Sequence, residues 1–122
     1  TNLRVAGALY LPGVISPAQI TASQNDYAPT GFSAASIVRL SSDAAWSITG
    51  LAGGTAGRAV LLVNVNTGSP ASINLTHDDA GSVAANRFLL TGNTTRSLLA
   101  QSGQMFWYDG TSSRWRAVSM GT

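Results

Sequence analysis

The sequence predicts an all-β protein, an antiparallel β-sandwich of jelly-roll type, and three observations support this class. Short apolar runs alternate with clusters of Gly, Asn, Asp, Ser and Pro at the spacing expected of a sandwich or barrel. The chain contains no Lys and no Glu, two residue types that favour exposed helices. Its 122 residues suit one ordinary domain rather than two.

The first 19 residues differ in character from the rest. Leu3–Leu11 is apolar and predicts a strand, which Pro12-Gly13 and Pro17 then interrupt. The segment is either an arm that packs on a neighbouring subunit or a capsid shell, or an edge strand of the same sandwich. Both alternatives stay open, and residues 20–122 are assigned to the β-sandwich domain.

Eight further strands are predicted, each bounded by turn residues. They are Ser36–Leu40, Ala45–Ile48, Arg58–Val65, Ala71–Thr76, Arg87–Leu90, Thr95–Leu99, Gln104–Tyr108 and Arg114–Ser119. Asn66–Pro70 is expected to be a turn, and Asp78–Asn86 a loop with a single 3₁₀ turn. In the turn after Ile48, the residues expected to supply positive φ angles are Gly50, Gly53 and Gly54.

The last two strands form the clearest predicted hairpin, around Asp109, Gly110 and Thr111. Alternation along the strand places Trp107 on one face of the sheet and Tyr108 on the other. The hairpin aromatics, which include Trp115, are candidates for core packing, for a subunit contact or for a platform that stacks on a sugar ring.

Charge patterning indicates assembly rather than binding to nucleic acid. The formal net charge is +2, but all basic residues are Arg and they are scattered along the sequence. Only Arg114 and Arg116 lie close together, and at a spacing of two they share one face of a strand. We interpret them as solvated or interface residues, with no nucleic-acid partner.

Neither a membrane partner nor a redox-active site is indicated. The longest apolar stretch, Ala59–Val65, is interrupted by Asn64 and is too short for a membrane span, and no secretory signal opens the chain. There is no cysteine, so the chain has no disulfide and no thiolate site.

One group of residues resembles a metal or acid–base site. His77 is followed by Asp78 and Asp79, but no other potential ligand stands at a suitable spacing, so a capped turn is the favoured interpretation. No Gly-x-Ser-x-Gly motif is present, and Gly50–Gly57 lacks the Lys of a phosphate-binding loop. The sequence predicts no catalytic residue, no cofactor and no metal.

Several segments, taken in order, resemble a module of tailed-bacteriophage structural proteins. They are Ile20–Gly31, Val38–Asp43, Ile48–Gly54, Gly57-Arg58, Ala84–Phe88 and Tyr108-Asp109 through Arg114–Arg116. Such modules occur in head fibres, capsid decoration proteins and tail-fibre or baseplate components. The resemblance covers about residues 20–118, nearly the whole chain except the N-terminal segment.

The resemblance implies a β-sandwich, often homotrimeric, that decorates the virion or contacts the host. The expected function is therefore a non-enzymatic virion component, a capsid decoration protein or short head fibre whose partners are its own copies and the major capsid protein. The alternative is a receptor-binding tip that recognises host glycans. The candidate contact residues for either role are Trp107, Tyr108, Trp115, Arg114 and Arg116, while Gly50, Gly53, Gly54, Asp109 and Gly110 are expected to form structural turns.

Overall fold

A computed structural model describes residues 3–68 and 72–118 and confirms the all-β class. Its strands are β1 (Val14–Ile15), β2 (Ile37–Leu40), β3 (Ser47–Ile48), β4 (Ala59–Asn64), β5 (Ile73–Leu75), β6 (Phe88–Leu89), β7 (Arg96–Leu98), β8 (Gly103–Asp109) and β9 (Arg114–Val118). The helical segments in the described residues are short 3₁₀ turns, η1 (Phe32–Ala34), η2 (Ala84–Asn86) and η3 (Thr91–Asn93). The predicted 3₁₀ turn between residues 78 and 86 is η2.

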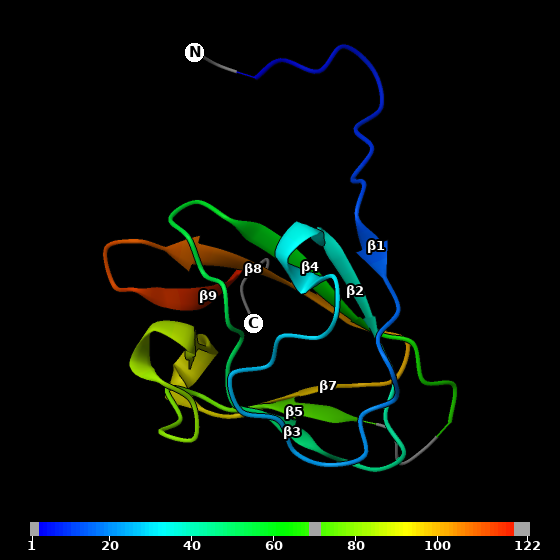
Figure 1. The fold of residues 1–122 in the computed structure, drawn as a ribbon, viewed down its shortest axis with the longest axis vertical. Helices are drawn as coiled ribbons and strands as arrows, with labels where there is room; N and C mark the ends of the chain where they lie inside the picture. Colours follow the sequence, from blue (N-terminus) through cyan, green and yellow to red (C-terminus); the bar gives the residue numbers. More distant parts are fainter. Residues whose placement is uncertain (1–2, 69–71, 119–122) are drawn as a thin grey trace.

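The strands form two sheets that lie on opposite sides of a common core (Figure 1). The larger sheet has the order β1-β2-β4-β8-β9-β6, and the smaller has the order β3-β5-β7. Both sheets are mixed, which corrects the expected antiparallel arrangement. Only β4–β8, β8–β9 and β5–β7 are antiparallel among the paired strands, while β1–β2, β2–β4, β3–β5 and β6–β9 are parallel.

The pairs β1–β2 and β2–β4 are parallel because the chain makes three successive passes in the same direction. Val14 pairs with Ile37, and Ile37 pairs with Leu61, so each pass returns to the same position after 23 or 24 residues. Parallel strands need a long crossover connection, and residues 16–36 and 41–58 provide it. No repeated motif in the sequence marks this arrangement, because the residues that pair between β1, β2 and β4 differ from one strand to the next.

The N-terminal segment contains a strand, but not where the sequence predicts it. Residues 3–13 form no strand, so the prediction for Leu3–Leu11 is wrong, and the first pairing is made by β1 instead. Apolar composition alone does not make a strand unless the backbone has a partner, and this stretch has none within the described chain. Pro12 and Pro17 flank β1, the edge strand of the larger sheet, where their missing N–H groups discourage further strand pairing.

The core is one cluster of buried apolar side chains between the sheets. It combines the inward residues of both sheets with loop residues, namely Ile20, Tyr27, Phe32, Ala35, Val38, Leu40, Ile48, Leu51, Val60, Leu62, Ile73, Leu75, Phe88, Leu90, Leu98, Phe106, Tyr108 and Trp115. Phe88 and Phe106 pack with ring centroids 4.7 Å apart. The predicted alternation in β8 is confirmed, because Phe106 and Tyr108 are buried while Trp107 is exposed.

Asn64 is the polar residue that interrupts the apolar run of β4, and it joins the two sheets. Its side chain is fully buried, and its Nδ2 donates to the carbonyl oxygen of Leu98 in β7 at 2.8 Å. Its Oδ1 accepts from the backbone N–H of Asn66 at 3.0 Å. A buried amide is tolerated only when its donors and acceptors are satisfied, so Asn64 fixes how the end of β4 sits against β7.

Among the expected turn glycines, only one of the three after Ile48 has a positive φ. Gly53 has φ 80°, whereas Gly50 and Gly54 are required because other groups approach them closely. A Cβ at Gly50 would collide with the carbonyl oxygen of Asn86, and one at Gly54 would collide with the ring of Tyr108. The expectation of positive φ at Gly50 and Gly54 is therefore wrong, because tertiary contacts rather than turn geometry select these glycines.

The β8–β9 hairpin is confirmed, but the residue with a positive φ in its turn is not the one expected. The strands pair from Met105 with Val118 to Asp109 with Arg114. Asp109 Oδ1 accepts from the N–H of Thr111, and the residue with positive φ is Ser113 (53°) rather than Gly110. The turn predicted for Asn66–Pro70 and the ends of two predicted strands, Ala71 and Ser119, include positions outside the described residues.

Replacing Gly50 by Ala tests the close approach after β3. We expect Gly50→Ala to lower the free energy of unfolding by about 1–3 kcal/mol, because the added methyl group must displace the backbone at Asn86. The matched control is Gly68→Ala, where a Cβ would meet no atom within 4 Å. Urea denaturation measures both variants, and equal stability of the two would contradict this account.

Candidate assembly surface

The outer face of the larger sheet is apolar, although it faces away from the core. The strand register aligns one large apolar side chain from each of five neighbouring strands, in the row Val14, Ile37, Leu61, Met105 and Val118. A second row places Ala59 beside Trp107 and Arg116. Met105 and Trp107 are 39% and 41% exposed. β4 therefore presents apolar side chains to both sides, which is typical of a strand covered on both faces.

The outer face of the smaller sheet has the opposite character. Its cross-strand row is Ser47, Asn74 and Ser97, all polar and short. Ser97 Oγ donates to Asn74 Oδ1 at 2.9 Å, so the two side chains partly satisfy each other. One sheet thus has a water-compatible outer face and the other does not.

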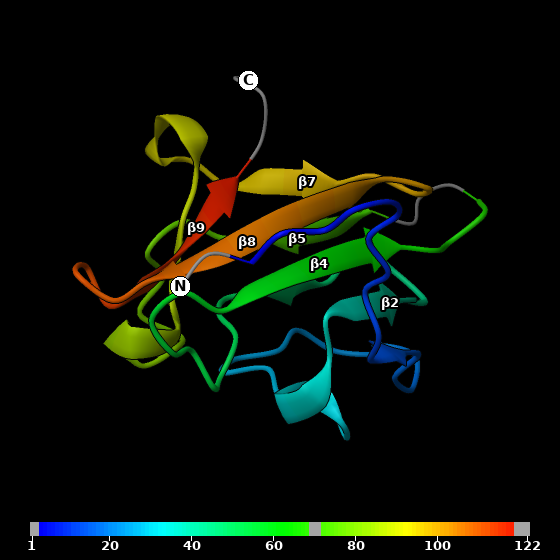
Figure 2. The same cartoon turned by 90° about the horizontal axis from the view of Figure 1, so that it is seen from above.

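The segment of residues 3–13, which we call the arm, adds to the apolar surface. It leaves the body at β1 and rises from it, and in the view from above its trace runs along the direction of β8 and β4 (Figures 1 and 2). Leu9 and Leu11 line an apolar cavity of about 170 Å³ together with Leu61 and Met105 of the outer face. Of the eleven exposed large hydrophobic residues in the described chain, nine lie on the arm or on this face of the sheet.

The predicted aromatic contact residues separate into one exposed and two buried side chains. Trp115 is fully buried, and its Nε1–H donates to the carbonyl oxygen of Leu51 at 2.8 Å. Tyr108 is 6% exposed, donates from its hydroxyl to the carbonyl oxygen of Ala85, and meets Trp115 edge to face at 5.1 Å. Both belong to the core rather than to a contact surface, because they point inward. Only Trp107 remains accessible to a partner.

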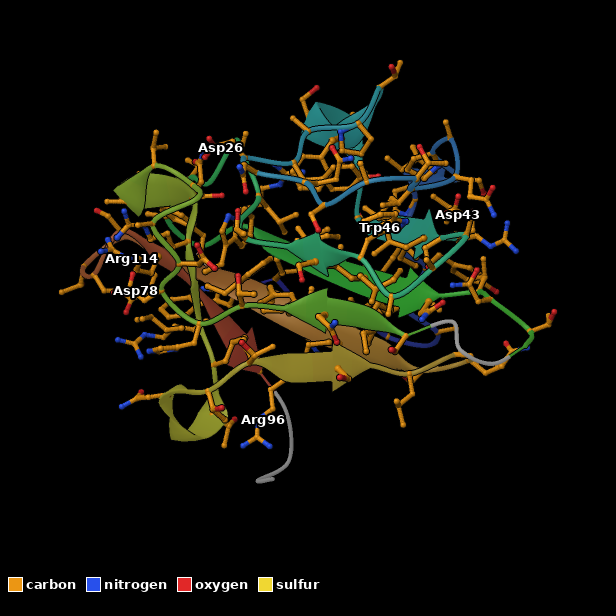
Figure 3. The ribbon with its side chains drawn as sticks, turned by 90° about the horizontal axis from the view of Figure 1, so that it is seen from below. Asp26, Asp43, Trp46, Asp78, Arg96 and Arg114 are labelled. Carbon is orange, nitrogen blue, oxygen red and sulfur yellow. The ribbon has the colours of Figure 1, made fainter. Side chains whose placement is uncertain are left out.

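Arg114 and Arg116 point to the outer face, and each is paired with an aspartate. Arg114 Nε lies 3.0 Å from Asp78 Oδ1, and the two residues are adjacent at one end of the molecule (Figure 3). Arg116 Nε lies 2.7 Å from Asp109 Oδ2. These pairs place a neutralised polar border beside the apolar rows, an arrangement that suits the rim of a protein interface better than it suits phosphate binding.

The group around His77 is explained by local structure. His77 Nδ1 accepts from the N–H of Leu90 at 3.0 Å, and Asp78 pairs with Arg114 and, at 3.7 Å, with Arg87. Arg87 also donates from Nε to the carbonyl oxygen of Ser82, and this hydrogen bond ties Arg87 to the preceding loop. Within residues 3–68 and 72–118, no three His, Asp, Cys or Glu side chains are grouped as a metal site requires.

Sequence reasoning missed a polar cluster that joins three loops. Asp26 Oδ1 accepts from the N–H of Val83 and from Nδ2 of Asn86, and the N–H of Asp26 donates to Ser82 Oγ. Ser82 Oγ in turn lies 2.7 Å from Thr49 Oγ1. The partners are separated by more than 30 residues, so no local motif could have revealed them. These hydrogen bonds join protein groups to one another, which indicates a structural role.

Sequence reasoning also missed the contacts of the Arg58 guanidinium with Phe32, Ala35 and Gly53, which we call the clasp. The guanidinium lies over the ring of Phe32, 4.4 Å from the centroid, and donates to the carbonyl oxygens of Gly53, Phe32 and Ala35. Burial lowers the pKa of this guanidinium. The clasp joins the start of β4 to the segment before β2 and to the loop after β3, so these contacts have a structural role.

Comparisons with models of known protein families, with curated proteins and with solved structures found no match. In the described part of the chain, no helix is long and apolar enough to cross a membrane.

The aspartates of the polar border predict a loss of stability in acid. Hydrogen bonds from Arg116 and Thr111 hold the pKa of Asp109 at about 2, and Arg114 lowers the pKa of Asp78. Because both values are depressed in the folded state, their stabilisation is present above about pH 4, the unfolded value, and is lost as the pH falls toward 2. We expect Arg116→Gln to flatten this acid dependence in urea titrations between pH 2 and 5.

Arg39 provides the control for this titration. It is exposed and donates to Ser16 Oγ rather than to a carboxylate. Arg39→Gln should retain the steep loss of stability seen in the parent chain. If Arg116→Gln and Arg39→Gln gave the same profile, the Asp109–Arg116 pair would have no part in the acid dependence.

Proposed function

We propose that this protein is a non-enzymatic structural component of a tailed-bacteriophage virion. In this proposal the two sheets form a jelly-roll-like sandwich that assembles as a homotrimer and decorates the capsid, as a decoration protein or short head fibre bound to the major capsid protein. The resemblance of residues 20–118 to phage structural modules supports the class of protein. The observation that carries the proposal is the apolar outer face of the larger sheet.

That face carries a continuous row of apolar side chains, of which Val14, Met105 and Val118 are exposed. Five side chains in one row, with Trp107 beside them, form a contiguous surface, and monomeric proteins rarely expose apolar patches larger than a few hundred Å². A central apolar area with a Trp and a border of Arg–Asp pairs has the composition of a protein interface. The face therefore favours association with another protein surface.

The composition of the chain lowers the entropic cost of self-association. Lys and Glu are absent, and the polar surface consists mainly of Ser, Thr, Asn, Gln and Gly. Short side chains lose little rotamer freedom when they are buried between copies, whereas Lys and Glu lose up to about 2 kcal/mol each. A low-charge surface also limits repulsion between identical copies.

A charge placed in the middle of the apolar row tests the proposed assembly. Met105→Glu should convert the trimer to a monomer, because it would bury an unpaired carboxylate in the interface. Sedimentation velocity at micromolar concentration measures the change, and near-ultraviolet circular dichroism of the tryptophans checks that the fold is retained. Ser97→Glu, on the polar face of the smaller sheet, should remain trimeric.

The parent chain also provides a direct test. A monomeric parent at high micromolar concentration that does not bind capsids assembled from the major capsid protein would refute the proposal. Loss of the trimer in both Met105→Glu and Ser97→Glu would instead show that the apolar face is not the interface.

A second candidate function, recognition of host glycans, is favoured by a hollow between the ends of the two sheets. The hollow has a volume of about 260 Å³ and a floor of Leu75, Leu90 and Leu98. Arg96 lines it and is oriented by two hydrogen bonds, from Nε and Nη2 to the carbonyl oxygen of Thr91. None of the described carboxylates pairs with Arg96. Guanidinium, hydroxyl groups and an apolar floor together suit a sugar that bears a carboxylate.

Glycan binding at this hollow is testable by titration. If the protein is a receptor-binding tip, galacturonate or sialic acid should shift the amide signals of residues 90–98 in NMR spectra at millimolar concentration. Arg96→Gln should weaken this binding at least ten-fold, whereas Arg39→Gln should not change it. Unshifted spectra for the parent chain would eliminate this candidate and leave the assembly proposal intact.

A further inference from the structure

The arm is apolar along its length, yet its own chain covers little of it. Leu3, Leu9 and Tyr10 are 89%, 65% and 84% exposed. Arg4 is the only charged residue between positions 1 and 13. Burial of these apolar side chains against another apolar surface would be favourable.

The root of the arm is fixed by the fold rather than free to turn back. The carbonyl oxygen of Gly13 accepts from the N–H groups of Ser36 and Ile37 at 2.9 and 3.3 Å. Gly13 has φ 75°, and a Cβ at this position would collide with the carbonyl oxygen of Ala34. Pro12 precedes it and restricts the backbone further. These constraints direct residues 3–11 away from β1 and over the outer face (Figure 1).

We propose that the arm of one copy packs on the outer face of the larger sheet of a second copy. The proposal rests on the self-assembly proposed above and names the surfaces that meet. Its apolar side chains would cover the row that includes Leu61, Met105 and Val118 of the neighbour, and Trp107 would lie at the border of the contact.

The dimensions of the two surfaces agree. Eleven extended residues reach at most about 36–40 Å, and six strands spaced about 4.8 Å apart make a sheet about 24 Å wide. One arm is therefore long enough to cross the apolar row completely. On its own chain, Leu9 and Leu11 line a cavity beside this row rather than fill it.

The contact also has the right symmetry for a closed ring. Arm and outer face are different surfaces, so each copy would donate one and receive the other. Such a heterologous contact generates a ring when its rotation closes, in contrast to the self-complementary contact of a two-fold dimer. Arm exchange is thus consistent with the proposed trimer and links each copy to both of its neighbours.

Cross-linking between two single-cysteine variants tests the exchange directly, because the natural sequence contains no cysteine. Tyr10→Cys on the arm and Met105→Cys on the face are made in separate full-length chains, one of them labelled with ¹⁵N. The chains are mixed, reassembled and oxidised. A disulfide-linked heterodimer of mixed isotope composition is expected. Tyr10→Cys mixed with Ser97→Cys, on the opposite polar face, should give at least ten-fold less heterodimer.

A second variant measures what the arm contributes to assembly. Leu3→Ser, Leu9→Ser and Tyr10→Ser combined in the full chain should weaken association at least ten-fold in sedimentation equilibrium. The matched control, Val83→Ser with Leu99→Ser, changes exposed apolar residues that lie elsewhere and should associate like the parent.

The outcomes separate this inference from the function it rests on. If the parent is trimeric, but the arm variant associates normally and no mixed heterodimer forms, the arm exchange is refuted and the assembly proposal stands. If the parent is monomeric, both are refuted. A mixed heterodimer together with weakened association of the arm variant would support both.

Discussion

The structure depends on the position of Trp115, the largest fully buried side chain among the described residues. Its indole N–H donates to the carbonyl oxygen of Leu51, 64 residues earlier in the sequence, and its ring meets the edge of Tyr108. Tyr108 in turn lies against Gly54, where no other residue leaves enough space. These contacts hold the β8–β9 hairpin against residues 51–54, which follow β3. They also orient the hairpin so that Met105 and Trp107 face outward.

With the hairpin in this position, the outer faces of the two sheets differ in polarity. The inner faces share one core, and the outer face of the smaller sheet consists of Ser47, Asn74 and Ser97. The larger sheet presents apolar side chains on its outer face as well, most clearly along β4. The same backbone thus provides a folding surface on one side and a surface suited to association on the other.

Two Arg–Asp pairs lie at the edge of that surface. Asp109 with Arg116 and Asp78 with Arg114 neutralise one another beside the apolar rows. Hydrogen bonds from Arg116 and Thr111 keep the pKa of Asp109 at about 2, so this carboxylate stays ionised in all but strongly acidic solution. A border of paired charges can exclude water from an apolar centre without adding net charge to it, as expected at the rim of a contact between identical copies.

The sequence by itself determined the all-β class, eight of the strands, the C-terminal hairpin and the inward or outward direction of its aromatic residues, because alternation and turn residues act within a few positions. Only the tertiary structure decided that the sheets are mixed, that Gly50 and Gly54 are required by close contacts, and that Asp26 and Arg58 tie distant loops together. It also decided that Leu3–Leu11 is an arm without strand pairing. The physical reason is range: the parallel pairs of β1 with β2 and of β2 with β4 join residues 23 and 24 positions apart, and the contact of Asp26 with Asn86 joins residues 60 positions apart, so no local pattern specifies the partners.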